Sequence, residues 1–457
     1  MRFRKLIEKD FDSLVADLQG CIRIPSLYRA DDSGYPYGKP VQECLEYTLA
    51  LAEKLGFATH NMDNQLGWCE YGSGEELVAV LGHLDVVPEG DGWTVPPYGG
   101  EVKDGRIYGR GSMDDKGPTI AALYGLKAIK DSGLPLNKRI RILFGLNEET
   151  GSADMKYYVS HGGEIPVMGF TPDGEYPVIN GEKGLINEAY TCTFTQPGPL
   201  VVKSITGGTA HNIVPHYAKA EIACPGELAD RISVMEAEGI RVTRSRDGVT
   251  VEAFGVSAHG GTPQEGVNAN GRRVQFLTKL PLKGGLATAI TFLAEKIGME
   301  WDGASLGIAM ADEVSGPLTC NFGVLTGDET SLEVKLNYRY PVTKHFDMCG
   351  PQVQAAFENA GFCRTAATHK KCLYMRPDSQ LVQRLMKVYT DCTGDAAEPK
   401  SIGGGTYAKM LPNVVAFGPI FPGDEVREHK PDEFMELSRL LDNANILAEA
   451  MYALAAD

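Results

Sequence analysis

Apolar runs of strand length recur in the first and last parts of the chain, separated by polar loops. The clear ones are residues 77–81, 139–146, 167–171 and 414–417. Between the first two, apolar side chains recur every three or four residues from Ile120 to Ile129, which is the spacing of one helix face. This stretch starts with Pro118 and ends near Gly133, as helices often do. Strand, helix and strand in this order predict a parallel βαβ unit.

The pattern changes in the middle of the chain. Residues 200–205, 249–254 and 332–340 alternate in polarity, which predicts antiparallel or mixed strands, and residues 285–296 predict a helix. Helical patterns also cover parts of residues 8–56 and return at 379–389 and 431–455. We therefore expect an α/β fold, with a mixed, mostly parallel sheet flanked by helices over residues 1–186 and 378–457, and an inserted α+β domain over residues 187–377.

A weak repeat lies within the inserted segment. Residues 207–215 and 255–263 both read Gly-x-Ser/Thr-Ala-His, followed by Pro four positions after the histidine. A pattern this short can arise by chance. It also fits an inserted domain that is built from two similar halves.

The composition is that of a soluble protein with more than one domain. The chain has 457 residues, 43% of them hydrophobic, and a formal net charge of -16. This negative balance argues against a nucleic-acid partner, because phosphates are bound through Lys and Arg. We find neither a secretory signal nor an apolar run of the ~20 residues that span a membrane. Ten scattered cysteines fit reduced thiols, so we expect a cytoplasmic protein without a membrane partner.

Histidines and acids, the residue types that bind metal ions, follow the predicted strands at their carboxyl ends. Taken singly, each has a simpler explanation, such as an N-cap for an Asp or a turn for Pro-Asp-Gly. Taken together, they converge where open α/β sheets place their sites. The set consists of His83 and Asp85 after the first strand, Asp114 before the helix, Glu148 and Glu149 after the second strand, Asp173 after the third and His429 after the last.

The ligand types and their charges restrict the metal. Imidazole and carboxylate ligands without thiolates suit zinc, manganese or cobalt. Asp114, Glu149 and Asp173 bring three negative charges, so two divalent cations and a bridging hydroxide would leave the centre about neutral. One ion alone would leave excess negative charge. We therefore expect two divalent metal ions per chain, zinc or manganese, with cobalt as an alternative.

The chain resembles the dinuclear metallopeptidase family of aminoacylase, carboxypeptidase G and carnosinase, and most closely its bacterial dipeptidase V (Xaa-His dipeptidase) branch. The motifs that carry the resemblance extend over most of the chain, ending at His429. They are His83-x-Asp85, Gly109-x-Gly111-x-x-Asp114-Asp115-Lys116-Gly117, Glu148-Glu149 and Pro172-Asp173.

The resemblance implies a zinc-exopeptidase type of catalytic domain and a role for each of these residues. Asp114 would bridge both ions, the peptide between Asp114 and Asp115 would be cis, and Glu148 would be the general base. Asp85 would support the ligand His83 without binding a metal ion itself. The implied ligands are His83, Asp114, Glu149, Asp173 and His429.

The resemblance also assigns residues of the inserted domain, which would act as a lid. His259 would stabilise the oxyanion, while Asn212, rather than the neighbouring His211, would contact the substrate. Arg339 would bind the substrate carboxylate, and Lys409 stands where relatives often carry Arg. The backbone N–H groups of a glycine-rich loop would also bind this carboxylate. They belong to Gly404, Gly405 and Thr406. Because a doubled lid can imitate a partner subunit, we expect a monomer with His259 acting within its own chain.

The expected function is a metal-dependent dipeptidase that acts on dipeptides or small peptides with a free C-terminal carboxylate. An alternative within the same family is an N-acyl amino acid amidohydrolase, such as a desuccinylase or aminoacylase. A catalytically dead binding protein is a further alternative, although the retained Glu148 argues against it. A cysteine hydrolase is another, which sensitivity to thiol reagents would reveal.

Overall fold

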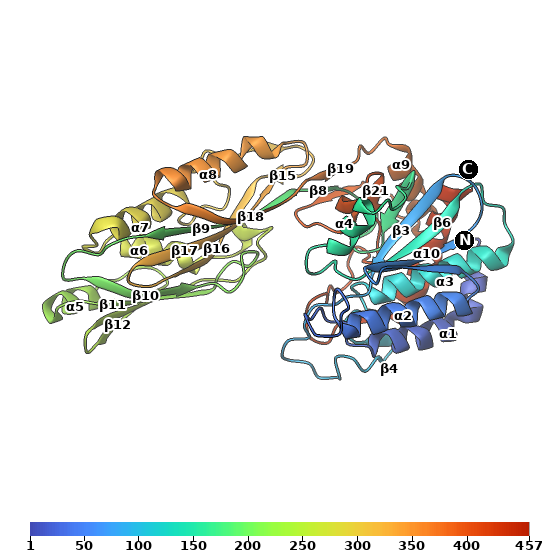
Figure 1. Cartoon of the computed structure of the whole chain (residues 1–457), viewed down its shortest axis with the longest axis horizontal. Coiled ribbons are helices and arrows are strands. Elements are labelled where there is room, and N and C mark those ends of the chain that lie inside the picture. The colour runs from blue at the N-terminus through green and yellow to red at the C-terminus, as the bar shows by residue number, and fades with distance from the viewer. Residues whose placement is uncertain (457) are drawn as a thin grey trace. The chain divides into compact units, whose positions relative to one another are not determined.

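The computed structural model describes residues 1–456, which form two compact units (Figure 1). Unit 1 contains Met1–Asn180, Met375–Lys400 and the chain from Gly405 onward, and unit 2 contains Gly181–Tyr374 and Ser401–Gly404. The middle of the chain is thus inserted into unit 1. The expected domain boundaries after residues 186 and 377 stay predictions, because a compact unit need not fold independently.

A mixed sheet forms the centre of unit 1. Its strands lie in the order β1-β2-β6-β3-β7-β21-β8, with β3, β6, β7 and β21 parallel to one another and the flanking strands antiparallel. The four apolar runs that predicted strands are all in this parallel part. The bounds are β1 Ala58–Met62, β2 Leu66–Tyr71, β3 Leu77–His83, β6 Arg139–Gly145, β7 Met168–Thr171, β8 Ile179–Glu182 and β21 Val414–Ala416.

Six helices pack around this sheet. The predicted helix after Pro118 is α3, which packs against α1 and α10, while α10 also packs against α9 (Figure 1). Apolar side chains of α3 and all residues of β3 are buried, so the predicted βαβ unit lies in the core. The bounds are α1 Arg4–Ile22, α2 Lys39–Lys54, α3 Lys116–Ser132, α4 Ala153–Ser160, α9 Gln380–Thr393 and α10 Leu437–Ala455.

The last helix starts later than the sequence pattern predicts. The expected helix over 431–455 is wrong in its first turns, because Phe434–Glu436 form strand β22 and α10 begins at Leu437. β22 pairs with β5 (Arg106–Tyr108), which pairs with β4 (Glu101–Lys103). Phe434 and Met435 are buried in this small sheet, and Asp432 has a positive φ of 54° that a helix does not allow. Pairing with a distant strand therefore outweighs the local helical pattern.

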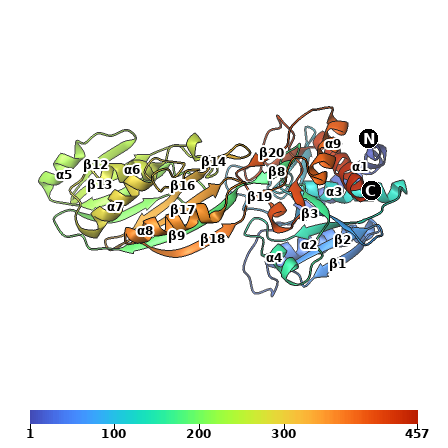
Figure 2. The ribbon, with the colours of Figure 1, turned by 90° about the horizontal axis from the view of Figure 1, so that it is seen from above.

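Unit 2 has an antiparallel sheet of eight strands (Figure 2). It consists of two four-stranded groups that meet at a single pair, Ile205 with Gly327. Outward from this junction the order is β10-β11-β13-β12 on one side and β16-β17-β9-β18 on the other. In each group a helix connects the second strand of this order to the outermost strand, α5 between β11 and β12 and α8 between β17 and β18. This shared order supports two similar halves. The bounds are β9 Gly184–Thr193, β10 Val201–Gly207, β11 Tyr217–Ala223, α5 Gly226–Ser233, β12 Ile240–Ser245, β13 Gly248–Phe254, β16 Thr319–Gly327, β17 Ser331–Tyr340, α8 Gly350–Asn359 and β18 Cys363–Lys370.

Helices α5, α6 (Ala269–Leu277), α7 (Gly284–Lys296) and α8 share one hydrophobic cluster with this sheet. The remaining elements are short. They are the pair β14 (Ala311–Asp312) and β15 (Gly316–Pro317), strands β19 (Leu373–Tyr374) and β20 (Lys400–Ile402), and the 3₁₀ turns Pro263–Glu265, Phe346–Met348 and Tyr407–Met410. Among residues 1–456, none of the helices combines the length and the apolar character that crossing a membrane requires.

The weak repeat does not mark the two halves, so that interpretation is wrong. One copy follows β10 and the other follows β13, and both strands flank β11 within the same half. Because these two strands end at the same edge, the copies pair with each other. The N–H of Gly260 donates to the carbonyl of Asn212 at 2.7 Å, and Ile213 lies opposite His259 in an antiparallel bridge.

Candidate metal centre

His83 ends strand β3 at the carboxyl edge of the sheet. Strand β6 runs parallel beside it, so Gly145 lies next to His83 and the acids Glu148 and Glu149 follow within a few residues. The Nδ1 atom of His83 is 3.0 Å from the carbonyl oxygen of Asp85 and 3.4 Å from its carboxylate. This contact holds the ring so that Nε2 points away from Asp85, toward the other acids.

The Asp114 carboxylate lies between two imidazoles. Its Oδ1 is 3.0 Å from His83 Nε2 and its Oδ2 is 2.9 Å from His429 Nε2. His429 Nε2 is also 3.1 Å from Glu149, and His83 Nε2 is 3.9 Å from Asp173. The structure thus brings together all five side chains that the sequence nominates as ligands.

Glu148 and Asp115 lie beside this cluster. Ligand atoms of Glu148, His83 and Asp173 fall within 4.8 Å of one another. The peptide between Asp114 and Asp115 is cis, as the resemblance implies. The Asp115 carboxylate accepts the backbone N–H of His83 at 3.1 Å and the hydroxyl of Thr119 at 3.0 Å, so it holds β3 and α3 together.

Two buried carboxylates shape the loop that carries the paired glutamates. Asp85 accepts the backbone N–H groups of Glu148 and Glu149, each at 3.1 Å. Asp154 accepts the N–H of Leu146 at 2.6 Å and also accepts a hydrogen bond from the Tyr407 hydroxyl. The sequence led us to expect that Asp85 supports His83, but not that it also binds the backbone of Glu148. Asp154 and Tyr407 were missed, since an Asp in the first turn of a helix is ordinary in a sequence.

Glu433 shapes the loop that carries Asp114. Its Oε1 accepts the backbone N–H groups of Gly111, Met113 and Asp114 at 3.0, 2.9 and 3.2 Å. Its Oε2 accepts Arg110 Nη1 at 2.6 Å, and the whole side chain is buried. The sequence pattern placed Glu433 within the helix that was expected over residues 431–455. The apolar pair Phe434-Met435 directly after it was the available sign of burial.

The carboxylates of this cluster are close enough to repel one another. Burial would raise the pKa of Asp114, but hydrogen bonds from His429 and His83 outweigh it and hold the pKa well below its usual value. Burial and the negative charge of Asp114 raise the pKa of Asp173 and of Glu149. Divalent cations would relieve this repulsion. Two imidazole nitrogens with carboxylate oxygens are donors that zinc, manganese and cobalt accept, so the residues fit a metal pair.

A family model described as peptidase family M20/M25/M40 matches residues 79–453, a span that includes every residue of this cluster. The chain belongs to this family. M20 peptidases are metal-dependent enzymes, and this chain is one of them by sequence and by fold. The donor set above is therefore consistent with the family chemistry.

Similar proteins match this chain over nearly its whole length. "Putative dipeptidase YtjP" of Bacillus subtilis is 37% identical, over 97% of this chain and 97% of that protein. Human carnosine dipeptidase 1 has a TM-score of 0.59 at 15% identity, over 99% of this chain and 98% of that one. The YXEP protein of Bacillus subtilis, described as a dinuclear metal binding peptidase, has a TM-score of 0.54 at 11% identity, with 98% of each chain covered. The two structures share the fold with this chain.

The predicted lid residues cluster within unit 2. Arg339, at the end of β17, is buried, and its Nη2 lies 3.3 Å from His259 Nε2. It donates to the carbonyl of Gly403 at 2.8 Å and to the side chain of Asn337 at 3.1 Å. Burial lowers the pKa of Arg339 to about 10. The residues that the structure describes place no carboxylate at ion-pair distance from this guanidinium. Asn212 is adjacent through its carbonyl contact with Gly260.

The glycine-rich loop is divided between the units, with Gly404 in unit 2 and Gly405 and Thr406 in unit 1. The Thr406 hydroxyl accepts the N–H of Ala408 at 3.1 Å and caps the short helix that contains Tyr407. This places Tyr407 where its hydroxyl reaches Asp154. The predicted loop therefore connects directly to the loop of the paired glutamates, whereas its anion-binding role stays a prediction.

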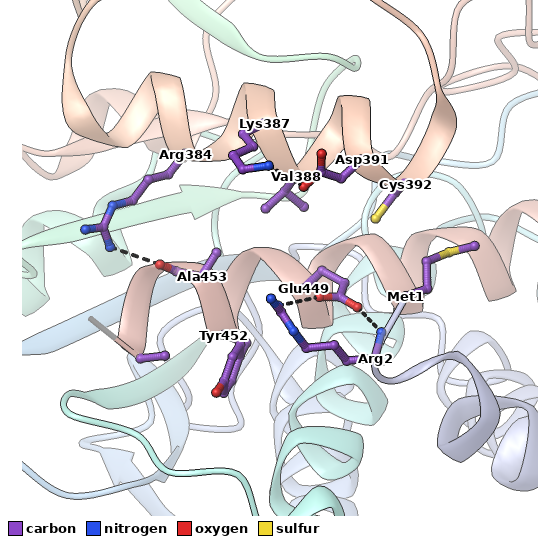
Figure 3. A pocket seen from close by; sticks show the side chains of 11 residues that line it. Met1, Arg2, Arg384, Lys387, Val388, Asp391, Cys392, Glu449, Tyr452 and Ala453 are labelled. Carbon is purple, nitrogen blue, oxygen red and sulfur yellow. Dashed lines mark hydrogen bonds and ion pairs between the residues drawn. The ribbon is translucent and has the colours of Figure 1, made fainter.

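A cavity of about 370 Å³ lies elsewhere in unit 1, between α9, α10 and the first two residues (Figure 3). Most of its charged side chains form ion pairs with one another. Arg2 pairs with Glu449 at 2.9 Å, and Lys387 pairs with Asp391 at 2.7 Å, while Arg384 donates to the carbonyl of Ala453 at 3.0 Å. Its lining includes no histidine. We assign no chemistry to this cavity.

Proposed function

We propose that this M20 peptidase is a dipeptidase that hydrolyses the amide bond of dipeptides with a free C-terminal carboxylate. One observation carries the proposal: a single carboxylate, Asp114, faces two imidazoles through its two oxygens, at 3.0 and 2.9 Å. This arrangement suits a bridging ligand between two ions. The name of the relative YtjP supports the choice of dipeptides as substrates.

The five ligands divide naturally around Asp114. His83 and Asp173 would hold one divalent ion, His429 and Glu149 would hold the other, and Asp114 would contribute to both. Zinc or manganese would occupy the centre, with cobalt as an alternative. When bound, such a pair of ions lowers the pKa of a water molecule and polarises a carbonyl group.

Glu148 would act as the general base. Its carboxylate lies close to the side chains of His83 and Asp173, and its backbone N–H donates a hydrogen bond to Asp85. Its carboxylate would take a proton from the attacking water and then give that proton to the leaving amine of the substrate. The backbone contact matters because proton transfer needs a donor and acceptor within hydrogen-bond reach.

Arg339 and His259 of unit 2 would bind and polarise the substrate. The buried guanidinium of Arg339 has no carboxylate partner among the described residues, and a bidentate bond to the substrate carboxylate would balance its positive charge. His259 would donate a hydrogen bond to the oxyanion that forms on the scissile carbonyl. Asn212 and the backbone of Gly404, Gly405 and Thr406 would complete the substrate contacts. We propose that a single chain suffices for this activity.

A substrate panel tests the proposal. The purified protein would be assayed on dipeptides, on the same dipeptides with an amidated C-terminus, and on N-acyl amino acids, each with added manganese, zinc or cobalt. We expect turnover of free dipeptides, and about two divalent ions per chain by elemental analysis. Preferential turnover of N-acyl amino acids would instead identify an amidohydrolase of the desuccinylase or aminoacylase type. Absence of bound metal would contradict both functions.

A further inference from the structure

The carboxylate of Glu433 connects two segments that carry candidate metal ligands. It lies four residues after His429 in the chain, and it binds the backbone of the loop that ends at Asp114. In addition, the Glu433 carbonyl accepts the N–H of Gly109 at 2.9 Å. The two segments are therefore joined at both the backbone and the side chain of one residue.

The loop is folded around this carboxylate as around a bound anion. Three backbone N–H groups, from Gly111, Met113 and Asp114, converge on one oxygen. Gly111 has a positive φ of 89°, which helps successive N–H groups point to the same side. The anion of this backbone cradle is a side chain of the protein itself. As a result, the direction in which Asp114 leaves the backbone depends on Glu433.

Asp432, the residue before Glu433, ties the segment of His429 to Thr94. The Asp432 carboxylate accepts the N–H of Thr94 at 2.7 Å and its hydroxyl at 2.9 Å. Glu433 thus adds the link that Asp432 does not supply, since Thr94 lies outside the loop of Asp114. Both acids hold His429 at a defined place, but only the bonds of Glu433 act on Asp114 as well.

We propose that Glu433 is a positioning residue of the metal centre, which sets the affinity for the ion that Asp114, Glu149 and His429 would share. This inference rests on the proposed function and deepens it. Glu433 itself touches neither metal nor substrate. It acts by holding two ligands in register before an ion arrives, so that little ordering remains to be done on binding. Partners that orient metal ligands in this way typically change affinity or activity by about 10–100-fold when they are replaced.

The test is a titration of the metal-free full chain with Co²⁺, followed by visible absorbance and by elemental analysis. For the wild type we expect two ions per chain. For Glu433→Gln we expect one Co²⁺ dissociation constant to rise by about 10–100-fold, with a smaller change in the other. The matched control is Glu436→Gln, three residues later on β22, where the glutamate pairs with Arg106 at 3.2 Å on the half-exposed surface. This control should leave both constants unchanged.

A second measurement separates positioning from a general loss of stability. In the His429→Ala background, Glu433→Gln should change the remaining Co²⁺ constant by no more than about twofold, because the two residues act on the same ion. If Glu433→Gln does not fold, Glu433→Asp keeps the charge beside Arg110 while its shorter side chain fails to span the three N–H groups. Thermal unfolding of each metal-free variant records the structural cost.

The outcomes distinguish the two proposals. A wild type that binds two ions, together with unchanged constants in Glu433→Gln, would overturn the positioning role alone. An equal weakening of both ions that persists in the His429→Ala background would also overturn it, because it would indicate a purely structural role. A wild type that takes up fewer than two ions would overturn the proposed function, and the positioning role with it.

Discussion

The side chain of Asp85 accepts the backbone N–H of Glu148 at 3.1 Å, so the residue that faces His83 also fixes the proposed general base. The two residues are far apart in the chain and follow adjacent parallel strands, β3 and β6. One carboxylate thus ties the end of strand β3 to the loop of Glu148 and Glu149. This relationship would let an acid two positions after the histidine serve the proposed site without being a ligand.

Asp85→Asn should reduce kcat by about 10–100-fold, as for other partners that orient metal ligands. The amide can accept one N–H but would turn its own NH₂ group toward the other, either Glu148 or Glu149. Steady-state kinetics at saturating metal would measure the loss. Asp131→Asn, on the surface of α3, is the control and should have the wild-type rate. A wild-type kcat in Asp85→Asn would contradict the assigned role.

Glu148→Gln should lower kcat on the order of 10²–10⁴-fold, the usual contribution of a general acid–base group. The amide is nearly the same size but cannot accept and return a proton. Metal content should stay near two ions per chain, since the five ligands are unchanged. The same preparation would be assayed for turnover and for metal. Loss of the metal with the rate would place Glu148 among the ligands instead.

His259→Ala should lower kcat on the order of 10²–10³-fold, as for loss of an oxyanion donor. The chain provides a matched control in His211, which occupies the same position in the other copy of the short repeat. His211→Ala should retain the wild-type kcat. Measuring both variants on one dipeptide isolates the role of His259. Equal losses in both would show that the effect is structural.

Arg339→Ala should raise KM for free dipeptides by about 10–100-fold, the cost of a lost charge-assisted hydrogen bond. The buried guanidinium contacts Gly403, Asn337 and His259 and no carboxylate of the described residues, so a substrate carboxylate would be its counter-ion. Amidated dipeptides lack that charge and should show a much smaller change. Comparing the two substrates separates carboxylate binding from a general disturbance of unit 2.

The stability of the metal-free protein should fall as pH rises above about 6.5. Burial would lower the pKa of His429, but hydrogen bonds and charge from Asp114 and Glu149 raise it to about 11. Because this folded-state pKa exceeds the unfolded value of about 6.5, the stabilisation is complete below pH 6.5 and is lost as pH rises through 11. Thermal unfolding of the wild type and of His429→Gln between pH 6 and 10 would measure this loss of stability. A variant with the same pH dependence as the wild type would contradict the assignment.

Local patterns predicted the parts of the molecule that depend on local physics. The buried strand β3 and the helix α3 have unambiguous periodicity, and side chains that follow adjacent parallel strands lie at the same edge of a sheet. The convergence of His83, Glu149 and Asp173 after β3, β6 and β7 was therefore predictable from the sequence. The start of α10 was not, because the competing strand β22 depends on its pairing with β5.

The roles of the carboxylates that bind these loops could not be predicted from the sequence, for a related reason. Glu433 and Asp154 accept backbone N–H groups from distant loops, and a sequence does not reveal which amides lack partners. A glutamate in a charged run and an aspartate at a helix start both have ordinary explanations. Only the folded chain shows that each is enclosed by the loop it supports.

Strand β21 lies between β7 and β8 in the sheet, although residues 414–416 are made long after both neighbours. A nascent chain that has not yet reached Val414 therefore lacks the strand between β7 and β8. His429 and Glu433 emerge later still. A chain that ends before these residues would lack a proposed metal ligand, so metal binding and hydrolysis would begin only when nearly the whole chain has been made.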